Sequence, residues 1–224
     1  MLLIEDESIE YSWALKVQET LVQAKKARVD LPDLLWLLSH PPVFTLGAKK
    51  SSRANVINPG PIPVIEISRG GDVTYHDEGQ IVGYLIMNLN SSDRDLHKVL
   101  NQLEEVIIRA LWEFNIIGYR VPGKTGVFVG EHKVCSIGIA CRHWITYHGF
   151  ALNLNSNLNN YQRINPCGLN SDLMQNLKMD PLQRKSLEQK IFWHTKSIFH
   201  KDRLKNEFTD IKAFLETYSI AYPA

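Results

Sequence analysis

Cys167 is the residue of this sequence best suited to nucleophilic chemistry. It lies in the stretch 164–168, Ile-Asn-Pro-Cys-Gly, where the proline before the thiol and the glycine after it favour a tight, exposed turn. Cys135 and Cys141 lie among apolar residues typical of strands, so we expect both to be buried as small hydrophobic side chains. The sequence therefore predicts one reactive thiol.

Lys133 is the second residue with potential chemistry, because it begins the strand-like stretch Lys-Val-Cys-Ser-Ile-Gly. Lysines are rarely buried unless they are paired or functional. Taken alone, Lys133 is more simply interpreted as a strand-end lysine that reaches water. Ser136, Ile137 and Gly138 alternate along the same stretch, which suits a strand edge that lines a pocket.

A glycine-rich segment runs from Arg69 to His76 between two predicted strands. Its paired glycines, Gly70 and Gly71, let a backbone approach a ligand closely, and hydrogen-bonding side chains surround them. A glycine-rich hairpin that binds nothing fits these residues equally well. A further strand-like stretch, His-Gly-Phe-Ala-Leu-Asn, begins at His148.

Two other site chemistries fit parts of this pattern. A zinc site built from Cys135, Cys141 and His143 lacks both a regular ligand spacing and a fourth ligand, so we expect no metal. A hydrolase that pairs Cys167 with His148 or with His76 is a stronger alternative, provided that a third group orients the histidine.

Composition limits the classes of function. The 224 residues suit one domain spanning 1–224, and a formal net charge of +1 gives no global field for nucleic-acid binding. The acidic start lacks the features of a signal or transit peptide, and the chain has no apolar run long enough to cross a membrane. We therefore expect a cytoplasmic protein with reduced thiols and no membrane contact.

Apolar periodicity predicts the elements that must position these residues. Spacing of four residues predicts a helix through 9–21, capped at Asp6 or Ser8, and short apolar runs predict strands at 34–38, 43–46, 64–67 and 81–87. Ser92 to Asp95 resembles a capping box that opens a helix to Phe114. The stretch 126–152 is strand-like, with a hairpin turn at 130–131.

Two helical patterns follow, and the last spans 204–218, while the role of about 175–200 stays open. Strands and helices mix without regular alternation, which predicts an α+β fold with mixed sheets flanked by helices.

Four stretches in order resemble the octanoyltransferase family, also called lipoate-protein ligase B. They are the Arg-Gly-Gly-x-x-Thr-x-His segment from 69, the Lys-x-x-Ser-x-Gly strand from 133, the His-Gly-x-Ala-Leu-Asn strand from 148 and the Asn-Pro-Cys-Gly turn from 165. The resemblance runs from about 34 to 169. It implies the α+β fold of the biotin and lipoate ligase catalytic domain, with mixed sheets around an acyl-binding tunnel.

The resemblance also implies a reaction without a cofactor. An octanoyl group passes from octanoyl-acyl carrier protein to the Cys167 thiol and then to a lysine of a lipoyl-accepting domain, with Lys133 as the activating residue. The implied acceptors are the lipoyl domains of 2-oxoacid dehydrogenase E2 subunits and the glycine cleavage H protein. We also expect a monomer. The implied substrate pocket comprises Arg69, Gly70, Gly71, Asp72, Val73, Thr74, Tyr75, His76, Ser136, Ile137, Gly138, His148, Gly149, Phe150 and Ala151.

One departure from the family pattern stands out. Asp77 and Glu78 replace a glycine and a proline, which removes the rigidity of proline from the loop. Lys49, Lys50 and Arg53 form a basic cluster that could steer acidic carrier proteins, although a solvated loop fits them as well. Two rivals remain: an ATP-dependent lipoate or biotin ligase on the same fold, and a non-catalytic module that binds acyl groups or carrier domains.

Overall fold

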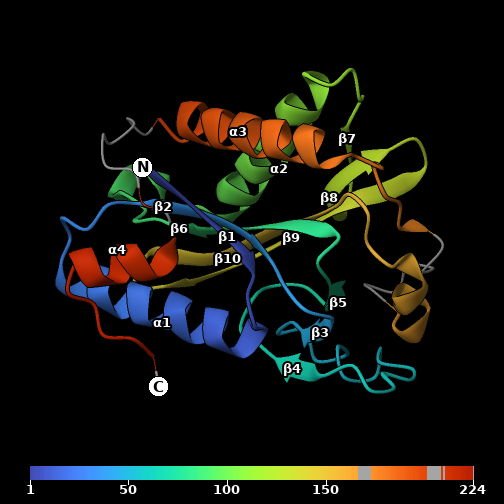
Figure 1. The fold of residues 1–224 in the computed structure, drawn as a ribbon, viewed down its shortest axis with the longest axis horizontal. Coiled ribbons are helices and arrows are strands. Elements are labelled where there is room, and N and C mark those ends of the chain that lie inside the picture. The colour runs from blue at the N-terminus through green and yellow to red at the C-terminus, as the bar shows by residue number, and fades with distance from the viewer. Residues whose placement is uncertain (166–172, 201–207, 209, 224) are drawn as a thin grey trace.

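The computed structural model describes residues 1–165, 173–200, 208 and 210–223. Its centre is a seven-stranded sheet in the order β1-β2-β6-β10-β9-β8-β7, and a three-stranded sheet in the order β4-β3-β5 lies beside it (Figure 1). Only the β1–β2 pair of the large sheet is parallel, whereas the pairs involving β6 to β10 are antiparallel. The predicted α+β class with mixed sheets is therefore confirmed.

The strands have the following bounds. The large sheet contains β1 (Leu2–Ser8), β2 (Leu34–Ser39), β6 (Gln80–Ile86), β7 (Tyr119–Val121), β8 (Lys124–Val129), β9 (His132–Arg142) and β10 (Ile145–Asn153). The small sheet contains β3 (Val43–Leu46), β4 (Val64–Glu66) and β5 (Val73–His76). The predicted hairpin at 130–131 is confirmed, because it joins β8 to β9.

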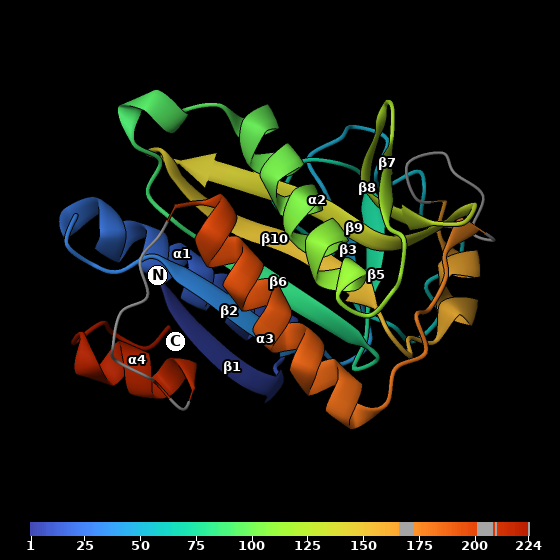
Figure 2. The same cartoon turned by 90° about the horizontal axis from the view of Figure 1, so that it is seen from above.

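In the described part of the chain, four α-helices cover the two faces of the large sheet: α1 (Tyr11–Ala27), α2 (Leu96–Trp112), α3 (Pro181–Ile198) and α4 (Ile211–Thr217). Figure 2 shows α2 and α3 side by side over one face, and Figure 1 shows α1 and α4 against the other. Two apolar clusters fill the resulting layers. Short 3₁₀ turns lie at Ser91–Asp93 and Leu158–Arg163.

Several predicted boundaries were wrong. The first residues form strand β1, and the cap of α1 is Glu10, whose carboxylate accepts from the backbone of Trp13, so neither Asp6 nor Ser8 caps it. The cap of α2 is Asp95 and no capping box forms there, because the residues before it make a 3₁₀ turn. The second half of the glycine-rich segment is strand β5. A short strand inside a polar stretch gives too weak an alternation to be recognised.

The region from 175 to 200, whose role the sequence left open, is mostly helix α3, and it packs on α2. Asp180 and Gln183 form a capping box at its start, and Pro181 occupies the first turn. The last helix is described only over Ile211–Thr217, and part of the predicted stretch 204–218 lies outside the described residues. Among the described residues, no helix combines the length and apolarity that a membrane span requires.

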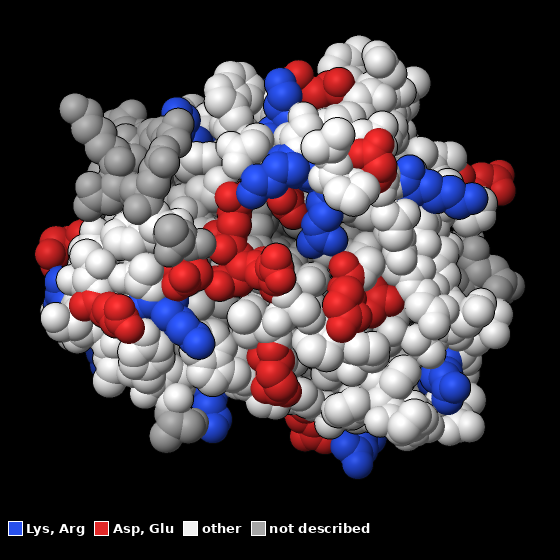
Figure 3. Space-filling view, in the orientation of Figure 1, with Lys and Arg blue, Asp and Glu red and all other residues white. Residues whose placement is uncertain are grey.

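Strand β1 forms one edge of the large sheet. Acidic side chains gather near the centre of the face shown in Figure 3, where a hollow between β1 and α3 is lined in part by Glu5, Asp6 and Glu7. Lys185 of α3 pairs with Glu5 across this hollow at 2.9 Å. Charged side chains along a sheet edge discourage pairing with a foreign strand.

Candidate active site

The site begins where strand β9 is no longer paired with strand β8. β8 pairs with β9 only as far as Cys135, and further along β9 the loop from Arg69 to Asp72 approaches, with the amide of Gly70 donating to the carbonyl of Ile139 at 2.9 Å. A Cβ on Gly138 would lie 2.8 Å from the Gly70 carbonyl oxygen, so a glycine is needed there for this close approach. The gap between β8 and the loop opens into a cavity.

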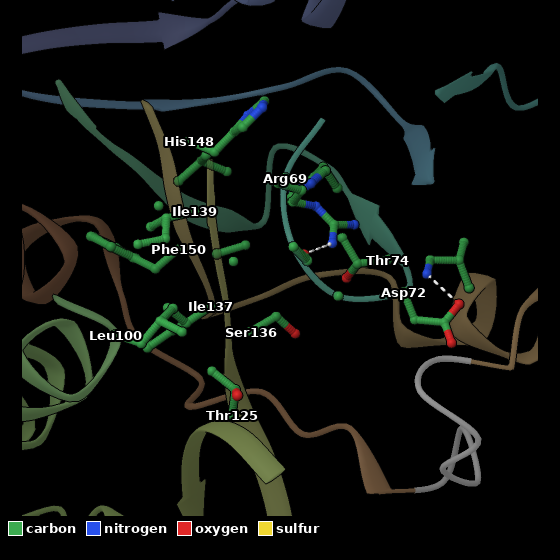
Figure 4. A pocket seen from close by; sticks show the side chains of 18 of the residues that line it. Arg69, Asp72, Thr74, Leu100, Thr125, Ser136, Ile137, Ile139, His148 and Phe150 are labelled. Atoms are coloured by element: carbon green, nitrogen blue, oxygen red, sulfur yellow. Dashed lines mark hydrogen bonds between the residues drawn. The ribbon is translucent and has the colours of Figure 1, made fainter. Parts of the chain in front are cut away.

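The cavity has a volume of about 540 Å³, within the usual range for small-molecule sites. Its two sides differ in chemistry (Figure 4). Leu100, Ile137, Ile139 and Phe150 form an apolar side, and the polar side chains of Arg69, Asp72 and Thr74 lie opposite. Such a cavity suits a ligand with an apolar chain and a polar group.

Three of the four predicted stretches meet in this cavity. Lys133 lines it together with these predicted residues: Arg69, Gly70, Gly71, Asp72, Val73, Thr74, His76, Ser136, Ile137, Gly138, His148, Gly149, Phe150 and Ala151. Tyr75 does not, because it packs against Phe44 and Tyr161 in a separate apolar cluster. The fourth stretch, with the predicted nucleophile Cys167, lies outside the described residues.

Lys133 is buried, with 8% of its surface exposed. Its Nζ donates a hydrogen bond to the carbonyl oxygen of Thr125 at 2.7 Å. Thr125 belongs to β8, so the lysine bridges the two arms of the hairpin next to the cavity. A buried ammonium beside a ligand cavity can stabilise an anion there, which is the activating role predicted for it.

The cysteines of β9 are both free thiols. Cys135 is fully buried, and burial raises the pKa of its thiol, so its predicted structural role is confirmed. Cys141 is only half-buried, at the far end of the strand, so its predicted burial was wrong. The end of an antiparallel strand is less covered than its middle, which sequence alternation does not reveal.

The guanidinium of Arg69 holds the glycine-rich loop. It donates to the carbonyl and to the hydroxyl of Thr45 on β3, at 3.1 and 3.0 Å. Asp72, further along the loop, is buried and accepts a hydrogen bond from Asn55 at 2.7 Å. Burial acts to raise the pKa of Asp72, but the hydrogen bonds from Asn55 and Val73 and the ammonium of Lys49 outweigh it and lower the pKa.

The predicted basic cluster is partly neutralised. Lys49 pairs with the Asp72 carboxylate at 3.2 Å, and Arg53 pairs with Glu66 at 3.1 Å. Lys50 remains exposed. These contacts indicate that Lys49 has a structural role at the cavity, in addition to any steering of a charged partner.

His148 occupies an unusual position. Its backbone φ is +59°, its side chain is 1% exposed, and neither ring nitrogen has a hydrogen-bond partner among the described residues. Burial, together with the Arg69 charge, lowers the pKa of His148 to about 3, so the ring is neutral at physiological pH. Figure 4 shows it at the opposite end of the cavity from Thr125, and thus from the Lys133 ammonium.

His76 has a comparable electrostatic setting. Burial lowers its pKa well below the usual value, and His40 and Arg69 lower it further. Its ring contacts Gln80 through Nδ1 at 3.1 Å. Two neutral histidines with depressed pKa values are weak proton acceptors at neutral pH, which disfavours a hydrolase that uses either as its base.

The sequence did not indicate the aromatic residues beside these histidines. Tyr11 and Tyr84 line the cavity, and the Tyr84 hydroxyl lies 2.6 Å from Nε2 of His40. Burial raises the pKa of Tyr11 to about 12 and lowers that of His40 to about 4. One signal for Tyr84 was available in the sequence, since it is a tyrosine inside an otherwise apolar strand. A buried hydroxyl usually needs a hydrogen-bond partner, so such a residue indicates a polar group nearby.

Asp77 supplies the rigidity that proline would otherwise give to its turn. One carboxylate oxygen accepts from the amide of Gly79 at 3.0 Å, and the other accepts from the amide of Asn157 at 2.7 Å. The φ of Asp77 is not positive, so the turn here requires no glycine at this position. The replacement fixes the β5–β6 turn to the segment that follows β10.

Residues 10–191 match the family of the lipoyl protein ligase A/B catalytic domain. The chain belongs to this family. An octanoyltransferase of Geobacter metallireducens is 45% identical over 161 residues, which cover 72% of the chain and 74% of that relative. An octanoyltransferase of Syntrophotalea carbinolica is 40% identical over 191 residues, or 84% of the chain and 89% of that relative. The expected octanoyltransferase activity, an acyl transfer in protein lipoylation, is therefore confirmed.

Solved structures of lipoate protein ligases share the fold. A lipoate protein ligase homologue from T. acidophilum, Ta0514, superposes with a TM-score of 0.75 at 15% identity, over 99% of the chain and 95% of that protein. A lipoate-protein ligase A bound with ATP superposes with a TM-score of 0.72 at 15% identity, over 99% of the chain and 94% of that protein. The predicted fold of the biotin and lipoate ligases is thus confirmed.

Proposed function

We propose that this family member transfers the octanoyl group through a thioester on Cys167, with Lys133 as the residue that activates the thiol. The observation that supports this role is the position of Lys133, which is buried and lines the cavity. The roughly 540 Å³ of space can hold an eight-carbon chain. The cavity is also lined by residues of the three motifs that precede the cysteine.

In the first step, the thiolate of Cys167 attacks the carbonyl carbon of the octanoyl thioester. The bond from that carbon to the sulfur of the donor breaks, and the departing thiolate takes a proton from the Lys133 ammonium. The enzyme is left with an octanoyl thioester and a neutral lysine. A thiol with the usual pKa of about 8.5 is mostly protonated at neutral pH, so an adjacent ammonium is needed to favour the thiolate.

In the second step, the neutral amine of the acceptor lysine attacks the same carbonyl. The new amide bond forms, the Cys167 thiolate departs, and the proton lost by the amine returns to Lys133. The cycle closes without ATP, because the thioester supplied by the donor is already activated. His76 and His148 are not needed as bases, in agreement with their lowered pKa values.

The donor proposed is octanoyl-acyl carrier protein, and the acceptors are lipoyl domains of 2-oxoacid dehydrogenase E2 subunits and the glycine cleavage H protein. A solved relative in fold supports the acceptor class, because it is described as an archaeal bi-partite lipoate protein ligase with its E2 lipoyl domain. A monomer working in the cytoplasm stays a prediction.

The test is intact-protein mass spectrometry after mixing with octanoyl-acyl carrier protein and no ATP. We expect one octanoyl adduct on the native protein, none on Cys167→Ala, and discharge of the adduct by a lipoyl domain. Cys141→Ala is the matched control, because it removes the half-buried thiol and should leave the adduct in place. An adduct on Cys167→Ala, or transfer that requires ATP, would contradict the thioester mechanism and favour the ligase rival.

A further inference from the structure

Glu104 is a buried carboxylate to which neither the sequence motifs nor the proposed reaction gives a role. It lies on α2 and is 5% exposed. One oxygen accepts a hydrogen bond from the amide of Gly126 at 2.8 Å, and the other accepts from Nε of Arg120 at 3.0 Å. A buried carboxylate is costly unless it is paired and hydrogen-bonded, and both oxygens meet this requirement here.

The Gly126 amide belongs to the same peptide group as the Thr125 carbonyl. Glu104 therefore binds the N–H side of this peptide, while the Lys133 ammonium donates to its oxygen at 2.7 Å. A carboxylate on the hydrogen side and an ammonium on the oxygen side polarise the peptide in the same direction. The two charges are thus connected through one planar, rigid unit.

We propose that Glu104 is a positioning residue for Lys133, acting through the peptide group that joins Thr125 to Gly126. The role rests on the activating function proposed above for Lys133. By fixing the plane of this peptide, Glu104 directs the Thr125 carbonyl at Nζ and holds the ammonium at the edge of the cavity. The negative charge of Glu104 also polarises this peptide, which strengthens the hydrogen bond from the Lys133 ammonium to the Thr125 carbonyl.

Arg120 and Cys135 also lie close to these charged groups. Arg120 on β7 forms an ion pair with the Glu104 oxygen that does not bind Gly126, and Arg120 also binds Glu105 at 2.8 Å. The charges of Lys133 and Glu104 both act on the thiol of Cys135 on β9. Burial raises the pKa of this thiol, the Lys133 charge acts to lower it, and the Glu104 charge acts to raise it. The fold thus links a helix carboxylate to the lysine through the peptide group that joins Thr125 to Gly126.

The experiment compares single-turnover acylation by octanoyl-acyl carrier protein in Glu104→Gln and Glu105→Gln. Glutamine at 104 keeps the side-chain length but offers the Gly126 amide only a neutral and weaker acceptor, so the peptide is held less firmly and we expect acylation to slow about tenfold with the KM for the donor unchanged. Glu105→Gln is the matched control. This substitution removes the ion pairs of Glu105 with Arg109 and Arg120. The Glu105 carboxylate does not bind the Gly126 amide, so the acylation rate of the variant should equal that of the native protein.

A double-mutant cycle separates positioning from a general loss of structure. If Glu104 acts through Lys133, Glu104→Gln should cause no further slowing in a Lys133→Ala background. Equal slowing in both backgrounds, or the same rate for Glu104→Gln and Glu105→Gln, would overturn the positioning role while leaving the thioester mechanism intact. Absence of the octanoyl adduct from the native protein would instead overturn the proposed function itself.

Discussion

Gly126 lies directly against the side chain of Lys133. A Cβ at this glycine would be 2.6 Å from Cε of Lys133 and 2.3 Å from the carbonyl oxygen of Cys135. The φ of Gly126 is +128°, in a region that side-chain-bearing residues rarely adopt. The absence of a side chain at 126 is therefore what allows the lysine to lie across the hairpin.

Gly126→Ala should displace Lys133 and abolish most acyl transfer. We also expect it to lower the free energy of unfolding by more than about 1 kcal/mol, because alanine is strained at positive φ. Urea unfolding and the rate of transfer to a lipoyl domain measure the two effects. Gly130→Ala is the control: its φ is +57° and nothing lies within 4 Å of its Cβ position, so it should lose stability and keep its transfer rate.

Asp77→Ala should destabilise the protein by roughly 1–3 kcal/mol, because it removes the acceptor for two backbone amides, those of Gly79 and Asn157. Thermal or urea unfolding measures the loss. Glu78→Ala is the matched control, since the Glu78 side chain is exposed and Arg184 binds only its backbone carbonyl. Equal stability of the two variants would show that the carboxylate of Asp77 does not hold the turn.

His148→Asn should leave the shape of the pH–rate profile unchanged between about pH 6 and 8. Burial and the Arg69 charge keep the histidine neutral over this range, because its pKa is about 3. Asparagine tolerates the left-handed backbone found at this position. The profile of acylation rate against pH is the measurement, and loss of an ionisation near neutral pH in the variant would identify His148 as a proton acceptor.

Stability should fall as the pH decreases from about 6.5 towards 4. Burial lowers the pKa of His40 from 6.5 to about 4, so the unfolded chain binds the proton more tightly than the native protein does. The stabilisation that the neutral His40 ring contributes is complete at pH values above the pKa of this histidine in the unfolded chain. It decreases as the pH falls, because protonation of the ring favours unfolding. His40 alone contributes a loss of roughly 3 kcal/mol at pH 4.

Urea unfolding at a series of pH values tests this dependence. His40→Gln should be less stable at neutral pH, because it loses the contacts of the ring with Ile9 and Tyr84, but its stability should depend less on pH. His97→Gln, at an exposed position, should retain the native slope. An identical slope in both variants would assign the acid sensitivity to other groups.

The sequence by itself determined the family, the mixed α+β class and most of the cavity. Those properties depend on local patterns: the glycines at 70, 71 and 138, the lysine that begins a strand at 133 and the histidine-glycine pair at 148 stand at fixed spacings along the chain. Apolar periodicity likewise located α2 and the β8–β9 hairpin. Spacing along a strand or helix fixes which residues share a face.

The tertiary structure alone decided which distant groups meet. Glu104 looks like any helix glutamate in sequence, and only the packing of α2 against β8 brings its carboxylate to the Gly126 amide. The edge strand β1 was missed and the cap of α1 was misassigned, because pairing of β1 with β2 depends on residues about 30 positions away. Hydrogen bonds and burial across elements depend on three-dimensional proximity, which one-dimensional spacing does not encode.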